Sequence, residues 1–272
     1  MILAKLVVAA LLLKNYEMKI CLALFGITRS LSYTKDSIIE NVINPLSAFS
    51  DFELVGHFYE NSFVQDEDKV NNVESHELLP FDDIKLQKAD NPESSEYYKE
   101  LIGFGDFWDN DFKSARNLFL QLNSLKALHD FPQVRNSDIC VFLRPDLRYH
   151  TSFGRVIPAL KALNEGEALI PFWQHWNGGL NDRFAACKGD LAKSAYATRG
   201  ELALEFCKQS NRPLQSEQLL QYSMQKNMVK TKSLDIKASR VRANGDEVKE
   251  DFEKRTMRNW LQKRRLVNSW NF

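Results

Sequence analysis

Residues 19–30, KICLALFGITRS, decide the fold of this chain. An apolar run closed by a glycine, here Gly26, is typical of a strand buried on both faces of a parallel sheet. Apolar residues between 38 and 43 then recur at helical spacing, and residues 52–59 (FELVGHFY) form a second apolar run. The chain therefore opens with a strand, a helix and a strand, the order of an α/β unit.

The same alternation continues towards the C-terminus. The patterns predict strands at 138–143 and 167–172, a strand or hairpin at 228–243, and helices at 111–131, 153–164, 190–208 and 214–226. We expect Thr34, Asp111 and Ser216 to cap helices, and Pro45 and Pro132 to end two of them. The fold class is therefore α/β, with a mostly parallel central sheet flanked by helices in a single domain over 18–247.

Composition narrows the class of protein. The 272 residues are 44% hydrophobic and 26% charged, with 36 basic and 36 acidic side chains. These fractions are typical of a globular chain, and zero net charge argues against a general nucleic-acid binder. The four cysteines are scattered, which predicts reduced thiols and a cytoplasmic protein. The sequence has no GxGxxG or GxxxxGK[ST] motif, which argues against dehydrogenases and P-loop kinases.

Three segments depart from the α/β pattern. Residues 1–17 are a mostly apolar leader, too short at 1–13 for a membrane span and interpreted as dispensable. Residues 60–100 hold twelve acids and four lysines, which predicts an irregular surface insertion. Residues 248–272 form a basic tail, helical at 248–265, that could lie on an anionic membrane or dock on the acidic segment. Peripheral membrane contact through residues 1–13 or this tail therefore stays open.

Polar residues follow two of the predicted strands, where ligands collect in parallel sheets. Arg144 and Asp146 follow the strand at 138–143, and the loop from Gly26 through Thr28 and Arg29 follows the first strand. A carboxylate there could ligate Mg²⁺ or Mn²⁺ that bridges two phosphates, and an arginine could pair with phosphate. An ion pair at a strand end and a local turn are the structural alternatives.

Residues 173–184, WQHWNGGLNDRF, form the other candidate cluster. Its two tryptophans offer faces for stacking on sugar rings, and its glycines let the backbone approach a ligand closely. Asn181 and Asp182 can bind hydroxyl groups, and Asp182 could act as a general base. The alternative is a well-formed turn that caps the next helix.

Other polar residues carry weaker signals. Ser124, on the long helix, could face the cleft, whereas His57 is interpreted as a core or edge histidine. Glu217 is most simply part of a helix start, although its carboxylate could reach the site.

The segments RPDL (144–147) and GLNDRF (179–184), with the GITR loop and an Asn-Ser pair on the long helix, resemble small nucleotide-sugar glycosyltransferases of the GT-A type. The family members in question act on capsular, cell-surface or viral glycans, and the resemblance runs from about residue 18 to residue 245. It implies a Rossmann-like GT-A domain, a nucleotide-sugar donor such as a UDP-sugar, Mn²⁺ or Mg²⁺, and a glycan or glycoconjugate acceptor.

The resemblance also implies roles for individual residues. Asp146 takes the place of the metal-binding DxD motif, with His175 or Glu217 as a further ligand. Gly26, Thr28, Arg29, Arg144 and Ser124 would then lie near the donor, and Asn181 and Asp182 near the sugar and acceptor. Arg144 stands where the first acid of DxD would be, which puts the metal in question.

The expected reaction is attack of an acceptor hydroxyl on the anomeric carbon, with Asp182 taking the proton. Direct attack inverts the sugar, and a retaining route stays open. Two other functions remain: a binding module that kept the fold without the chemistry, and a hydrolase using Asp146 and Asp182 as paired carboxylates.

Overall fold

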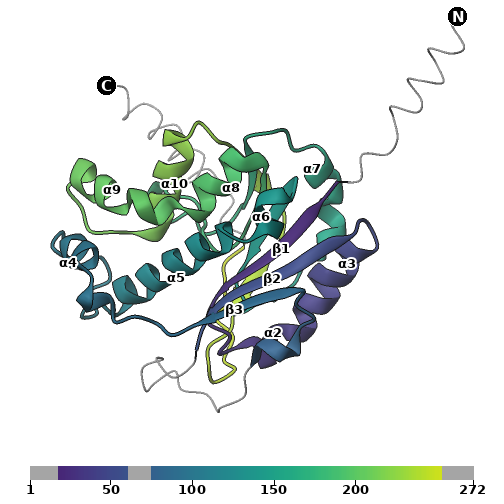
Figure 1. The fold of residues 1–272 in the computed structure, drawn as a ribbon, viewed down its shortest axis with the longest axis horizontal. Helices are drawn as coiled ribbons and strands as arrows, with labels where there is room; N and C mark the ends of the chain where they lie inside the picture. Colours follow the sequence, from purple (N-terminus) through teal and green to yellow (C-terminus); the bar gives the residue numbers. More distant parts are fainter. Residues whose placement is uncertain (1–17, 61–74, 253–272) are drawn as a thin grey trace, which may run out of the picture.

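A seven-stranded sheet forms the centre of the computed structural model, which describes residues 18–60 and 75–252 (Figure 1). The order is β3-β2-β1-β4-β7-β6-β8. Its strands are β1 (Ile20–Gly26), β2 (Phe52–Tyr59), β3 (Asp83–Gln87), β4 (Ile139–Leu143), β6 (Glu167–Pro171), β7 (Ala185–Lys188) and β8 (Lys230–Leu234). All run parallel except β7, which lies antiparallel between β4 and β6. The predicted mostly parallel sheet is confirmed.

Helices cover both faces of this sheet, giving three layers (Figure 1). One layer contains α2 (Leu31–Ile38), the π-helical turn η1 (Ile39–Ile43), α3 (Asn44–Ser47), η6 (Phe153–Val156) and α7 (Ile157–Lys161). The opposite layer contains α5 (Lys113–His129), α6 (Pro132–Asn136), α8 (Gly189–Ala197) and α10 (Ser216–Lys226). Beyond it lie α4 (Glu96–Ile102), η8 (Arg199–Leu202) and α9 (Ala203–Ser210).

The first strand shows how the sequence builds the two cores. Because side chains alternate along a strand, Ile20, Leu22 and Leu24 pack into one layer, while Cys21 and Phe25 pack into the other. Every one of these side chains is buried. The uninterrupted apolar run that predicted a central strand therefore reflects burial on both faces.

The first helix differs from its prediction at both ends. Ser30 precedes the helix, and Thr34 lies within it, where its hydroxyl donates to the backbone oxygen of Pro145 at 2.6 Å. The helix also continues past Pro45 as α3, after the π-helical turn. A wider turn relieves the clash between a proline ring and the carbonyl four residues earlier, so Pro45 does not end the helix.

Residues 61–74 of the acidic segment lie outside the described residues, and the rest of the segment is largely regular. Within 75–100 it forms η4 (Ser75–Leu78), the edge strand β3, η5 (Pro92–Ser94) and most of α4, so the prediction of an irregular insertion is wrong there. The side chains of β3 are largely exposed, and pairing with the backbone of β2 decides its conformation. An exposed edge strand carries little of the apolar pattern on which sequence prediction depends.

Two predicted caps are also wrong. Asp106 accepts hydrogen bonds from the backbone N–H groups of three residues ahead of α5, whereas Asp111 makes no cap. Gln215, not Ser216, caps α10 by accepting from the backbone of Gln218 at 2.7 Å. Pro132 ends the long helix and begins α6, because a proline fits the first turn of a helix.

The C-terminal part of the domain is not a hairpin. β8 joins the main sheet beside β6, whereas β9 (Ala238–Arg240) pairs antiparallel with β5 (Leu147–Tyr149) in a separate small sheet. In the chain, β5 follows directly after β4. Its pairing with β9 therefore brings residues near 240 to the polar end of the main sheet.

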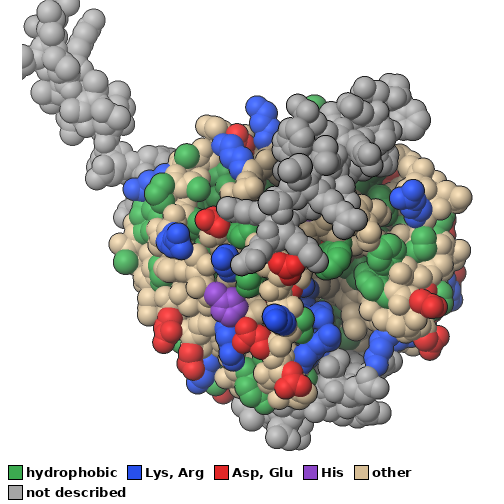
Figure 2. Space-filling view, turned by 180° about the vertical axis from the view of Figure 1, so that it is seen from behind, with side chains coloured by type: hydrophobic (Ala, Val, Ile, Leu, Met, Phe, Trp, Pro, Cys, Tyr) green, Lys and Arg blue, Asp and Glu red, His purple; other side chains and the backbone are tan. Residues whose placement is uncertain are grey.

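Charged side chains of both signs lie intermixed on the face shown in Figure 2. None of the helices in 18–60 or 75–252 is long and apolar enough to cross a membrane. The predicted leader at 1–17 and most of the predicted basic helix at 248–265 lie outside the described residues.

Candidate active site

A cavity of about 470 Å³ opens at the carboxyl ends of the parallel strands. Its wall is formed by the ends of β1, β2 and β4, the loop 173–184, one side of α5, the start of α10 and β9. Parallel strands end at one edge of a sheet, so segments far apart in sequence meet there. The lining carries four arginines (Arg29, Arg144, Arg183 and Arg240) and three carboxylates (Asp146, Asp182 and Glu217).

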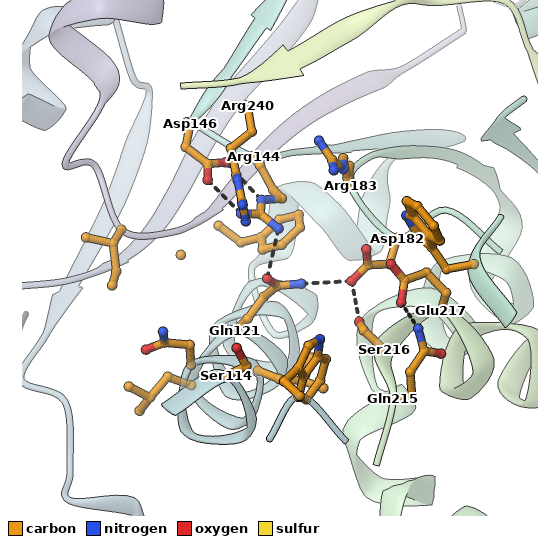
Figure 3. A pocket seen from close by; sticks show the side chains of 18 of the residues that line it. Ser114, Gln121, Arg144, Asp146, Asp182, Arg183, Gln215, Ser216, Glu217 and Arg240 are labelled. Carbon is orange, nitrogen blue, oxygen red and sulfur yellow. Dashed lines mark hydrogen bonds and ion pairs between the residues drawn. The ribbon is translucent and has the colours of Figure 1, made fainter. Parts of the chain in front are cut away.

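A chain of hydrogen bonds crosses the cavity floor (Figure 3). Arg144 donates to Asp146 on one side and, from Nη1, to the Oε1 of Gln121 at 3.2 Å on the other. The Nε2 of Gln121 in turn donates to Asp182 Oδ2 at 3.3 Å, and the Ser216 hydroxyl donates to the same oxygen. Gln121 therefore couples the arginine end of the cavity to its carboxylate end.

The Arg144–Asp146 pair is bidentate and buried. Arg144 Nε donates to Asp146 Oδ1 at 2.9 Å, and Nη2 donates to Oδ2 at 2.6 Å. Burial acts to raise the pKa of Asp146, but the charges of Arg144, Arg29 and Arg240 outweigh it and hold that pKa below its ordinary value. Asp146 is thus a carboxylate held by arginines.

Arg240 is the least satisfied cation of the group. Its Nε is buried and has no hydrogen-bond partner within the described part of the chain. Burial, reinforced by the neighbouring charge of Arg144, lowers the pKa of Arg240 to about 10. Such a side chain favours an anion that would complete its hydrogen bonds.

Asp182 and Glu217 form the carboxylate end. Burial, and then the negative charge of Asp182, raises the pKa of Glu217 to about 8. Gln215 Nε2 donates to Glu217, and the fully buried guanidinium of Arg199 lies behind Asp182, with Nη2 3.9 Å from Oδ2. A carboxyl whose pKa lies near neutrality is suited to exchange a proton with a substrate.

The loop 173–184 is fixed against α10 at Gly179. A Cβ there would lie 2.2 Å from the backbone carbon of Glu217, so only glycine permits this approach. Leu180 N–H then donates to the Glu217 oxygen at 2.9 Å. Gly179 therefore lets the backbone of the loop contact the backbone of α10 beside Glu217.

The two tryptophans of this loop have different roles. Trp176 is 54% exposed and lines the cavity, as a sugar-stacking ring would. Trp173 is buried, and its Nε1 donates to the Ile236 oxygen at 2.8 Å, so it does not offer a face to a sugar. Its ring packs instead under the Arg183 guanidinium.

Six of the residues that the sequence suggested for the site line the cavity: Gly26, Arg29, Arg144, Asp146, Asp182 and Glu217. Four others, Thr28, Ser124, His175 and Asn181, lie outside its lining, and their predicted roles stay predictions.

The side chains of Asn181 and Ser124 form hydrogen bonds with backbone groups. Asn181 Nδ2 donates to the Trp173 oxygen at 2.7 Å, and its Oδ1 accepts from the Arg183 N–H at 3.0 Å. The Ser124 hydroxyl accepts from Gly26 N–H at 3.0 Å and donates to the His57 oxygen at 2.9 Å, joining the ends of β1 and β2. These bonds make both side chains supports of the cavity wall.

His57 is fully buried, and its ring contacts Ser124 Oγ at 3.0 Å and Gln87 Oε1 at 3.1 Å. This placement confirms the interpretation of His57 as a core histidine.

A divalent cation does not fit the predicted ligands. Both oxygens of Asp146 accept from the Arg144 guanidinium, so a cation bound there would lie beside that positive charge. His175 Nδ1 accepts a hydrogen bond from the Asn181 N–H at 3.2 Å. Across residues 18–60 and 75–252 there is no group of three or more His, Cys, Asp or Glu residues that could hold a metal ion. Mg²⁺ and Mn²⁺ need oxygen ligands that are open to them.

Three residues that the structure brings to the site carry no clear signal in the sequence. Gln121 reads as a surface position of a helix, Arg240 lies in a polar stretch, and Arg199 carries no signal of burial. The helical period places Gln121 one turn before Ser124, which could have suggested a shared face. The placement of Arg240 depends on the pairing of β9 with β5.

The comparisons with known proteins give similarity of structure only. No protein-family model matches the chain, and no curated protein does. Among solved structures, the chain is similar to the galactosyltransferase LgtC in complex with donor and acceptor sugar analogs, with a TM-score of 0.41 and 12% identity over 79% of this chain and 73% of that one. It is also similar to mouse xyloside xylosyltransferase 1 in its apo form, with a TM-score of 0.40 and 11% identity over 80% of this chain and 85% of that one. Similarity at this level assigns no role to any residue of the cavity.

Proposed function

We propose that the protein is a glycosyltransferase that moves a sugar from a nucleotide-diphosphate donor to a hydroxyl group of a glycan or other acceptor. The observation that carries this proposal is the division of one cavity into an arginine end and a carboxylate end (Figure 3). A donor of this class has a dianionic diphosphate beside a neutral sugar, and the acceptor must lose a proton. The two ends match these two requirements.

The arginine end suits the diphosphate. Arg29, Arg144 and Arg240 converge from the loop after β1, the end of β4 and β9. Guanidinium groups bind phosphate oxygens through charged, directed hydrogen bonds and stabilise the charge that develops on a leaving diphosphate. The exposed ring of Trp176 adds a flat surface on which the base or the sugar can stack.

The carboxylate end suits the acceptor. Asp182 already accepts hydrogen bonds from Ser216 and Gln121, whereas Glu217 has the raised pKa of an effective base. We assign proton removal to Glu217, with Asp182 raising its basicity. This assignment modifies the prediction that Asp182 itself is the base.

The reaction balances without further reactants. The acceptor oxygen gives its proton to the Glu217 carboxylate and bonds to the anomeric carbon. The bond from that carbon to the diphosphate oxygen breaks, and the nucleoside diphosphate leaves with the electron pair. Direct displacement of this kind inverts the anomeric centre.

A donor screen tests the proposal. The full chain is incubated with UDP-, GDP-, dTDP- and CMP-sugars, with and without simple sugar acceptors, and release of nucleotide is followed. We expect release from one donor, with a loss of about 100-fold or more in Glu217→Gln, the range by which general bases accelerate reactions. Glu201→Gln, which changes an exposed carboxylate outside the cavity, is the control.

A second outcome supports a binding module. Binding of one nucleotide without release from any donor would show that the fold had kept the ligand and lacks the chemistry. If the protein neither binds a nucleotide nor releases one from any donor, the transferase proposal is refuted.

A further inference from the structure

We infer that Arg29, Arg144 and Arg240 bind the donor diphosphate directly and that no divalent cation takes part in binding it. The inference rests on the proposed function, because it names how that site holds its donor. It departs from the metal that the sequence resemblance implies, and it follows from the contacts of Asp146 and Arg240.

The partner of Asp146 disfavours a cation there. The bidentate pair uses one lone pair on each carboxylate oxygen, at 2.9 and 2.6 Å, and the Asp146 side chain is only 7% exposed. A metal ion on a remaining lone pair would lie beside the charge of the Arg144 guanidinium. Repulsion between two cations at such a distance in a poorly solvated cavity opposes that arrangement.

Hydrogen bonds to backbone oxygens fix the three arginine-bearing segments to one another. Val241 N–H donates to the backbone oxygen of Asp146 at 2.8 Å, and the Ser30 hydroxyl donates to the backbone oxygen of Val241 at 2.8 Å. Thr34 ties Pro145 to α2 in the same way. Each arginine therefore lies next to an anchored residue, and the cluster exists before any ligand arrives, as charge-stabilising groups of an active site do.

Arg240 competes with Arg144 for one carboxylate. Among the residues of the described cavity lining, Asp146 lies close to both arginines, and its bidentate pair is with Arg144. Arg240 keeps an unpartnered buried Nε, and its neighbours Arg144 and Asp146 are already paired to each other. A diphosphate supplies both the missing charge and the missing acceptor oxygens.

Direct binding of inorganic pyrophosphate and of UDP, GDP, dTDP and CDP to the full chain tests the inference. Titration calorimetry is run once with EDTA and once with Mn²⁺. We expect the same affinity within about twofold in both conditions. Arg240→Gln should weaken diphosphate binding by about 10- to 100-fold, which corresponds to the loss of one charged hydrogen bond. The affinity of Arg240→Lys should lie between that of Arg240→Gln and that of the parent.

Two further variants separate the arginine cluster from a metal site. Asp146→Asn removes the carboxylate that competes with pyrophosphate for the arginines, so it should keep or tighten pyrophosphate binding in EDTA. If Asp146 were instead a metal ligand, the same substitution would abolish binding in Mn²⁺. Arg148→Gln is the matched control, because Arg148 lies on β5 and pairs with Glu247 at 2.8 Å outside the cavity lining. It should change nothing.

Each outcome decides one of the two proposals. Diphosphate binding that vanishes in EDTA and returns with Mn²⁺ overturns this inference and leaves the transferase standing, if donor turnover is seen. Metal-free binding without turnover of any donor refutes the transferase and keeps the arginine site. An Arg240→Gln protein that melts like the parent and binds pyrophosphate unchanged also overturns the inference.

Discussion

Replacing Arg144 by methionine should destabilise the protein strongly, because it leaves the Asp146 carboxylate buried without its partner. Two unit charges about 4 Å apart attract by about 4 kcal/mol at an effective dielectric constant of about 20, and breaking one side of a buried pair costs about 3–5 kcal/mol. Arg29 and Arg240 still act on Asp146 in the variant. We therefore expect the low end of this range, about 3 kcal/mol.

The loss should be larger than that of Asp146→Asn. The Arg144 side chain is 19% exposed at the cavity, so water can reach it when its partner is removed, whereas the Asp146 side chain is only 7% exposed. Urea unfolding at pH 7 measures both variants. With an m-value of about 3 kcal/mol/M, the Arg144→Met midpoint should fall by about 1 M, and the Asp146→Asn midpoint by less than half of that.

The pH dependence supplies an independent check. In the parent, the folded-state pKa of Asp146 is below its ordinary 3.8, so the pair's stabilisation is present above pH 3.8 and is lost as pH falls through the lower folded-state value. In Arg144→Met, an unpaired buried Asp146 takes up a proton more readily as pH falls. The difference in unfolding free energy between parent and variant should therefore shrink from pH 7 to pH 4. A gap under about 1 kcal/mol at pH 7, or one independent of pH, would refute the reasoning.

Three more predictions follow from the site. Turnover should rise with pH up to about 8 as Glu217 loses its proton, and Glu217→Gln should remove that rise from the pH–rate profile. Gly179→Ala, whose Cβ would lie 2.2 Å from the backbone of α10, should lower both kcat and the melting temperature; Gly154→Ala, where the nearest atom is a side-chain oxygen at 3.3 Å, should do neither. Ser124→Ala should lower the free energy of unfolding by about 1–3 kcal/mol, because it leaves buried partners unpaired. The donor KM should stay unchanged at a temperature where the variant is folded. A clear rise in KM would show that Ser124 contacts the ligand, and Asn123→Ala on the same helix is the control.

The sequence predicted the sheet where side chains carry the pattern. The apolar runs of β1, β2 and β4 are buried on both faces, so each residue adds to the signal. By contrast, β3 is an exposed edge strand and β7 is four residues long, and pairing with neighbouring strands determines both. Neither has enough apolar periodicity to be recognised alone.

The sequence by itself predicted that Arg29, Arg144 and Asp146 follow the ends of two strands, where ligands collect in parallel sheets. It singled out Asp182 as part of the cluster 173–184, and only the folded chain brings that cluster to the same cavity. The pairing of Arg144 with Asp146 was one of the alternatives that the sequence left open, and the structure contains that pair. The sequence could not predict that Arg240 joins them from the far end of the domain, because this depends on the pairing of β9 with β5. Side-chain pattern reports local conformation and burial, whereas the charge balance of a site depends on distances between segments that only the folded chain brings together.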